Sequence, residues 1–72
     1  MDYMKLKGIR VSKGYTQEVL AEELGISTKT YNRKELGIIE FNRKEIAQLI
    51  EILDLSDSEV FNIFFASELP NV

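Results

Sequence analysis

Apolar residues recur at spacings of three and four along most of the 72-residue chain, which is the period of amphipathic α-helices. Glycines and N-terminal cap residues divide this pattern into five short helices. They are expected over about 3–13 after Asp2, 17–24 after Thr16, 28–36 after Ser27, and from 43 and 57 onward after Asn42 and Ser56. The pattern therefore predicts an all-α protein.

The helix starts carry two further local signals. Glu45 and Glu59 stand three residues after the caps Asn42 and Ser56, which is the spacing of a capping box. Hydrophobic staples are expected for the pairs Tyr15–Leu20, Ile26–Tyr31, Phe41–Ile46 and Leu55–Val60. The residues expected to face the core are Leu6, Ile9, Val19, Leu20, Ala21, Leu24, Ile46, Leu49, Ile50 and Leu53.

Composition narrows the class of protein. The chain has no Cys and no His, which excludes disulfides and removes the commonest metal ligand and general base. Glu22 and Glu23 are neighbours on a helix, face different directions and are expected to be solvated surface. No apolar run is long enough to span a bilayer, and the start of the chain has no signal-peptide pattern. We expect a non-enzymatic cytoplasmic protein, with no cofactor, metal or membrane contact.

Charge is distributed unevenly along the chain. Residues 1–34 hold seven Lys/Arg and four Asp/Glu, a balance of +3, whereas residues 35–72 hold two and eight, a balance of −6. The two halves sum to the net charge of −3. This asymmetry concerns association with partners rather than the fold, and ordinary surface solvation is an alternative explanation for it.

Residues 16–36 have the features of two helices that meet at a steep angle. Ala21 is the small residue needed where the axes come closest, and Gly25 adopts the positive φ of a tight turn without Cβ strain. The wedge would be closed by Leu20, Leu24, Ile26 and Tyr31, so that the second helix projects outward as a reading element.

These positions resemble the helix-turn-helix of the Cro/lambda-repressor (XRE-type) family. The resemblance covers about residues 5–65 and includes Tyr31-Asn32-Arg33-Lys34-Glu35, Gly37, Phe41 and Leu53-Asp54-Leu55-Ser56. It implies a compact five-helix lambda-repressor-like domain, placed at 1–66, with the helix-turn-helix at 16–36 and a C-terminal tail at 67–72. The family pattern implies base contacts from Thr28, Lys29, Asn32 and Arg33, and phosphate contacts from Gln17, Ser27, Lys13 and Arg10.

Three departures from the family pattern indicate a protein partner. The segment 36–40, Leu-Gly-Ile-Ile-Glu, is aliphatic and acidic where the family has basic residues, although Leu36 and Ile38 could fold inward and leave only Ile39 exposed. Lys34 stands at a usually apolar position, with its charge expected in water. The apolar residues within 61–65 cannot all face one core. The candidate partner surface is Lys34, Leu36, Ile38, Ile39, Glu40, Ile63 and Phe65.

Three functions follow from these features. The first is that of a modulator-of-repression (MOR-type) antirepressor of a temperate phage, which the chain resembles in size and acidity and which would bind the DNA-binding domain of its cognate repressor. The alternative is a Cro-like homodimeric repressor that reads operator DNA through Lys29 and Arg33 and dimerises through residues 61–65. A third is a joint complex with the repressor on DNA. Because the acidic second half opposes phosphate neutralisation, we expect the chain alone to bind DNA weakly.

Overall fold

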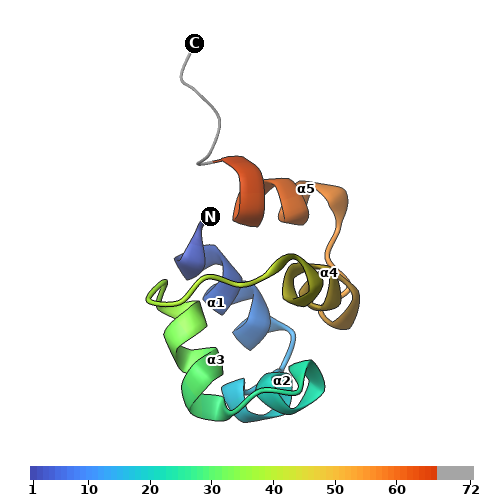
Figure 1. Ribbon diagram of the computed structural model, residues 1–72. Coiled ribbons are helices and arrows are strands. Elements are labelled where there is room, and N and C mark those ends of the chain that lie inside the picture. Colours follow the sequence, from blue (N-terminus) through green and yellow to red (C-terminus); the bar gives the residue numbers. More distant parts are fainter. Residues whose placement is uncertain (67–72) are drawn as a thin grey trace.

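Helices account for all the regular structure in residues 1–66, the part of the chain that the computed structural model describes. In order, they are α1 (Tyr3–Ser12), α2 (Gln17–Leu24), α3 (Thr28–Glu35), α4 (Arg43–Ile52), α5 (Asp57–Val60) and the π-helical turn η1 (Phe61–Phe65), which extends α5 (Figure 1). The all-α prediction is confirmed. The predicted tail, 67–72, lies outside the described residues.

Every helix from α1 to α5 begins after the cap residue that the sequence predicted. At each start, a side-chain oxygen of the cap accepts a hydrogen bond from the backbone N–H of the third helical residue. Both capping boxes, Asn42 with Glu45 and Ser56 with Glu59, are formed. A cap of this kind is worth about 1 kcal/mol, which matters because helices of ten residues or fewer are marginal on their own.

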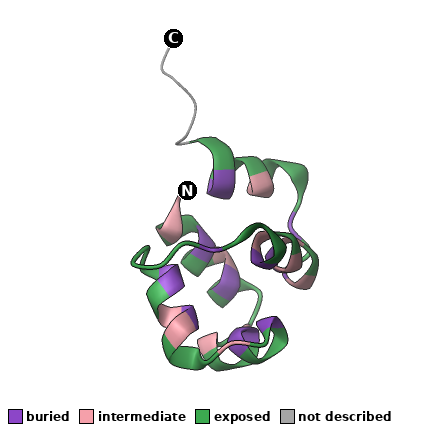
Figure 2. Cartoon of the chain, viewed as in Figure 1, coloured by how far each residue is buried: buried purple, intermediate pink, exposed green. Residues whose placement is uncertain are grey.

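The core is formed by the inner faces of α1 to α4 together with η1 (Figure 2). Its largest fully buried side chains are Tyr31, Leu6, Leu20, Leu49, Leu53 and Ile63. Ile9, Ile46 and Ile50 are only half-buried at its edge. The prediction for Val19 was wrong, since its side chain is 44% exposed. Successive residues of a helix are about 100° apart. The buried stripe of α2 runs through Leu20, Ala21 and Leu24, which turns Val19 toward solvent.

The end of the described chain packs back onto its beginning. The backbone N–H of Asp2 donates to the carbonyl of Ile63 at 2.6 Å, and this places η1 beside the start of α1. Ile63 and Phe64 point inward, whereas Phe61 and Phe65, four residues apart, are about half exposed. The prediction that residues 61–65 cannot all be buried is confirmed. Ile63 was wrongly assigned to the partner surface, because it belongs to the core.

Candidate nucleic-acid interface

The turn between α2 and α3 is held by a backbone motif at Gly25. This residue has φ +74°, in the left-handed region that glycine adopts without strain. The N–H groups of Gly25 and Ile26 donate to the carbonyls of Glu22 and Ala21, both at 3.0 Å, which is a Schellman cap. Ala21 is buried on the inner face of α2, and α2 is in contact with α3. The geometry is that of a helix-turn-helix.

Helix α3 has two faces with different surroundings. Tyr31, Lys34 and Glu35 are buried against the rest of the molecule. The predicted base-contacting residues lie on the other side, with Thr28, Lys29 and Arg33 exposed and Asn32 half-buried. Ser27 is exposed at the start of α3, where its hydroxyl accepts from the N–H of Thr30 at 3.0 Å and caps the helix. This outer face of α3 is open to a ligand.

A buried carboxylate anchors α3 to both preceding helices. The Glu35 side chain of α3 accepts from Nε and Nη2 of Arg10 in α1, at 2.8 and 3.0 Å, in a bidentate ion pair. It also accepts from the Tyr31 hydroxyl at 2.6 Å and from Nε2 of Gln17 in α2 at 3.1 Å. The remaining Nη1 of Arg10 donates to the carbonyl of Tyr15 at 2.7 Å. One acidic group therefore fixes the position of the candidate reading helix relative to α1 and α2.

Gln17 links the buried Glu35 to Asn32 on the outer face of α3 through hydrogen bonds. A carboxylate only accepts hydrogen bonds, so Glu35 holds the amide nitrogen of Gln17 and leaves its Oε1 as an acceptor. Asn32 must then offer its Nδ2, which donates to that Oε1 at 3.2 Å. In the described residues no buried side-chain polar atom lacks a partner, so the remaining Oδ1 of Asn32 reaches solvent as an acceptor.

The same cluster shifts the pKa of its members. Burial alone would raise the pKa of Glu35, but the hydrogen bonds from Arg10, Tyr31 and Gln17 outweigh it, and the pKa falls below its ordinary value. The hydrogen bond with Glu35 raises the pKa of Arg10. Burial, together with the neighbouring carboxylate, raises the pKa of the Tyr31 hydroxyl. The cluster is therefore a charged pair with a neutral phenol at physiological pH.

The structure corrects two of the predicted phosphate contacts. Arg10 is 6% exposed, and its guanidinium is occupied by Glu35 and Tyr15, so it has no free donor face for a phosphate. Lys13 directs its ammonium to the end of α4, where it donates to the carbonyls of Leu53 and Asp54 at 2.6 and 3.0 Å. Both cations therefore stabilise the fold. No local sequence pattern distinguishes them from cations that are free at the surface.

Lys34 is likewise not on the partner surface. Its ammonium lies 2.6 Å from Oε1 of Glu45, with both side chains buried, and 5.9 Å from the centroid of the Phe41 ring. The same Glu45 oxygen accepts from the Asn42 N–H at 2.9 Å. The expectation that the Lys34 charge remains in water was wrong, because Glu45 lies close enough to neutralise it. This second buried pair ties α3 to α4.

The turn after α3 exposes its aliphatic side chains. Leu36 is 63% exposed and Ile38 is 69% exposed. Ile39 is 39% exposed, and the neighbouring Glu40 is also exposed. The alternative in which Leu36 and Ile38 fold inward is therefore wrong. Gly37, within this turn, has φ +81°, and the Tyr3 ring lies against it. An apolar surface stands where the family pattern has basic residues.

Comparison with known proteins agrees with this geometry. A helix-turn-helix family model matches residues 6–60, well over half of the chain. The chain belongs to the helix-turn-helix family. Membership confirms the resemblance drawn from residues 16–31 and the non-enzymatic class that composition predicted.

One curated relative of this helix-turn-helix chain comes from a prophage. The chain is 40% identical over 52 residues to the SPbeta prophage-derived uncharacterized HTH-type transcriptional regulator YonR of Bacillus subtilis (strain 168). The match covers 72% of the chain and 48% of the relative, so the chain spans about half the length of that protein. No solved structure matches the chain significantly.

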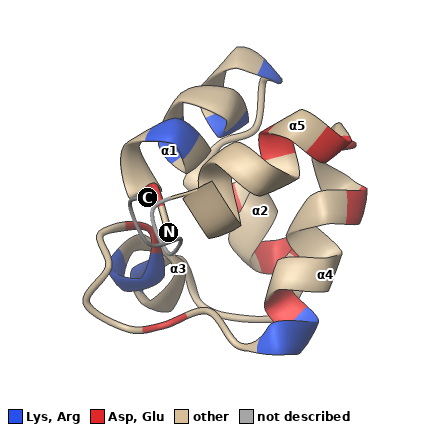
Figure 3. Ribbon diagram, turned by 90° about the horizontal axis from the view of Figure 1, so that it is seen from above, with Lys and Arg blue, Asp and Glu red and all other residues tan. Residues whose placement is uncertain are grey.

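Charge on the surface of this helix-turn-helix domain is segregated. Basic residues lie on α1, α3 and the start of α4, whereas acidic residues lie on α2, on α5 and toward the end of α4 (Figure 3). Around the reading helix, Lys29 and Arg33 are the exposed cations of α3 itself. In the described part of the chain, no helix is long and apolar enough to cross a bilayer.

Two residues that organise the site were not singled out from the sequence. Glu35 appeared only as part of the family pattern, and Glu45 only as half of a capping box. A faint signal was available for both, because each is an acidic residue at a helical spacing that points it toward the core. Their partners Arg10 and Lys34 are 25 and 11 residues away, so no local rule connects them.

Proposed function

We propose that the chain regulates transcription in a phage genetic switch as an antirepressor, which binds the DNA-binding domain of a partner repressor and keeps it from its operator. The observation that carries this proposal is the exposed aliphatic turn at Leu36 and Ile38, next to the acidic Glu40. A phosphate gains nothing against aliphatic side chains and is repelled by a carboxylate. A protein surface with apolar and basic groups is the better complement.

The small number of cations available to phosphates also favours a protein partner. Affinity for duplex DNA depends largely on the number of phosphates that Lys and Arg neutralise. Two predicted contributors are held by other groups of the protein, Arg10 in a buried ion pair and Lys13 by the carbonyls at the end of α4. If Lys29 and Arg33 alone neutralise phosphates, each chain would give a salt slope of only about −1.8, which is small for a DNA-binding protein. The acidic second half weakens the interaction further.

The comparisons support regulation of transcription in a phage setting. The B. subtilis relative is described as prophage-derived and as a transcriptional regulator. A protein partner is our addition to that description, and it is argued from the composition of the turn.

The proposal is tested by mixing the chain with the isolated DNA-binding domain of its cognate repressor and measuring mass by light scattering after gel filtration. We expect a defined heterocomplex that releases operator DNA from the repressor. Ile38→Glu should weaken this complex at least tenfold, because it places a charge in an apolar contact. Val11→Glu is the matched control, since Val11 is 58% exposed on α1, outside the turn, and should leave the complex intact. Separate elution of the two proteins would refute the antirepressor.

A second function, a Cro-like homodimeric repressor, is favoured by a different observation. Thr28, Lys29 and Arg33 are exposed on a well-anchored reading helix, and Phe61 and Phe65 are half exposed where a second copy could pack. It requires that the chain alone shift DNA from its own regulatory region in a gel assay at low salt. If both proteins are needed for the shift, a joint complex on DNA is indicated, which a promoter assay with each protein singly and together would verify.

A further inference from the structure

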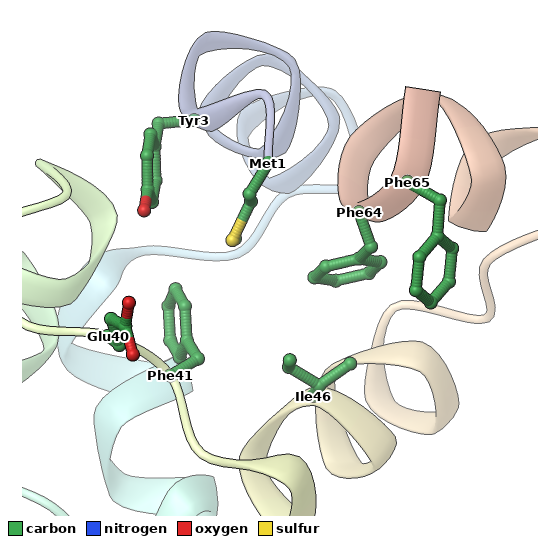
Figure 4. A pocket seen from close by; sticks show the side chains of 7 residues that line it. All are labelled: Met1, Tyr3, Glu40, Phe41, Ile46, Phe64 and Phe65. Carbon is green, nitrogen blue, oxygen red and sulfur yellow. The ribbon is translucent and has the colours of Figure 1, made fainter. Parts of the chain in front are cut away.

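A pocket opens between the two ends of the described chain and the connection from α3 to α4. It has a volume of about 250 Å³, and four aromatic residues, Tyr3, Phe41, Phe64 and Phe65, line it together with Met1, Ile46 and Glu40 (Figure 4). They come from the start of the chain, α1, the α3–α4 connection, α4 and η1. The volume is below the range of about 300–1,000 Å³ that is usual for small-molecule sites, and suits a single side chain better than a cofactor.

The acidic side chain that lines the pocket has no ion-pair partner among the described residues. Within residues 1–66 the Glu40 carboxylate joins no ion pair and accepts no hydrogen bond, and only its backbone carbonyl is used, by Lys34 at 3.4 Å. The ammonium of Lys34 on the Phe41 ring is already paired with Glu45, so those two charges cancel. A carboxylate beside aromatic rings attracts a cation, because the ring faces are also negative.

We infer that this pocket receives an arginine side chain of a protein partner. A guanidinium is planar and weakly hydrated, stacks on aromatic rings and pairs with a carboxylate through two hydrogen bonds. Its aliphatic stem would lie along Ile46 and Phe65, which is 51% exposed at the rim. Glu40 follows directly after Ile38 and Ile39, so the pocket and the exposed turn form one continuous surface.

This inference rests on the proposed function, since it names what the partner inserts beside the turn. An exposed arginine is expected on any surface that binds DNA phosphates and base edges. An antirepressor that covers such a surface must accommodate its guanidinium groups. The aromatic pocket with Glu40 supplies the neutralising and stacking groups that a DNA backbone and bases would otherwise provide.

The test uses the full chain and two small probes. N-acetyl-Leu-Arg-Leu-amide and the same peptide with neutral citrulline in place of arginine are titrated into 15N-labelled protein, and backbone amide shifts are followed by NMR. We expect saturating shifts at residues 40–41, 46 and 64–65 with the arginine peptide, and binding weaker by about fivefold or more with citrulline. Glu40→Gln should abolish the preference for arginine. Glu51→Gln, an exposed acidic residue of α4 outside the pocket, should retain it.

The inference is overturned if the arginine peptide causes no saturating shifts at these residues, or if both peptides bind equally to the unmodified chain. The NMR spectrum of each variant also reports whether it is folded. Failure of the antirepressor is a separate result, because absence of a heterocomplex with the repressor domain would leave the preference for arginine intact.

Discussion

Glu35 should be the charged residue on which stability depends most. It accepts four hydrogen bonds, two from the buried Arg10 and one each from Tyr31 and Gln17. Glu35→Gln leaves the guanidinium buried without a counterion, and removing one partner of such a pair costs about 3–5 kcal/mol. A domain of this size has a total free energy of unfolding of about 4–11 kcal/mol. We therefore expect the variant to lose a large part of its stability at 25 °C.

Urea unfolding at pH 7, followed by far-ultraviolet circular dichroism, measures this loss. The double variant Arg10→Met with Glu35→Leu removes both charges, so it should be more stable than Glu35→Gln, although Tyr31 and Gln17 still lose an acceptor. A loss below about 1 kcal/mol for Glu35→Gln would show that the pair is not the anchor of α3 that its geometry indicates. A double variant no more stable than the single would refute the argument from the uncompensated charge.

The same residue should give stability an acid-dependent component. The pKa of Glu35 in the folded protein is below its ordinary value, so its contribution is complete above pH 4.5 and is lost as the pH falls through the folded pKa. A backbone hydrogen bond from Ser56 lowers the pKa of Glu59 in the same direction, so Glu59→Gln is needed as a reference. Removing the Glu35 charge should flatten the acid limb of the stability curve more than Glu59→Gln does. Equal curves would contradict this assignment.

Three further predictions concern single positions. Gly37→Ala should lower the free energy of unfolding in urea by about 1–3 kcal/mol, clearly more than Gly14→Ala does. Both glycines have positive φ, but only a Cβ at position 37 would meet the Tyr3 ring, at 2.9 Å. Lys13→Met should lower the free energy of unfolding by about 1 kcal/mol, because the hydrogen bond to the end of α4 is lost. It should leave the salt dependence of any DNA binding unchanged. Arg33→Ala should reduce the salt slope of DNA binding by about 1, measured by fluorescence anisotropy, with stability unaltered; an unchanged slope would remove Arg33 from the interface.

The parts of the fold that could be predicted are those set by neighbours in the sequence. Caps, staples and the glycine turn act within about five residues, and the backbone has few other ways to satisfy its hydrogen bonds there. This is why the helix starts at Asp2, Thr16, Ser27, Asn42 and Ser56 were all correct. The outward direction of Lys29 and Arg33 was implied by the resemblance to the family, and both side chains are exposed.

What could not be predicted is which charged side chains bind other parts of the fold. Arg10, Lys13 and Lys34 look alike in the sequence as cations on helix faces, and each was expected at a surface. Their partners are 25, 40 and 11 residues away, so their engagement, and the burial of Arg10 and Lys34, depend on how the helices assemble. A burial pattern set by tertiary pairing is not visible in hydrophobic periodicity, because charged residues count as polar wherever they lie.

Cations that are held within the fold are not available to bind DNA. Each ammonium or guanidinium held by Glu35, Glu45 or the end of α4 is one that cannot neutralise a phosphate. The chain thus uses cations to fix the position of its reading helix, although DNA affinity depends on free cations. Net charge underestimates this effect, since a buried pair cancels in the sum but still withdraws a cation from the surface. A rigid reading helix with few free cations, beside an exposed apolar turn, is better matched to a protein surface than to DNA alone.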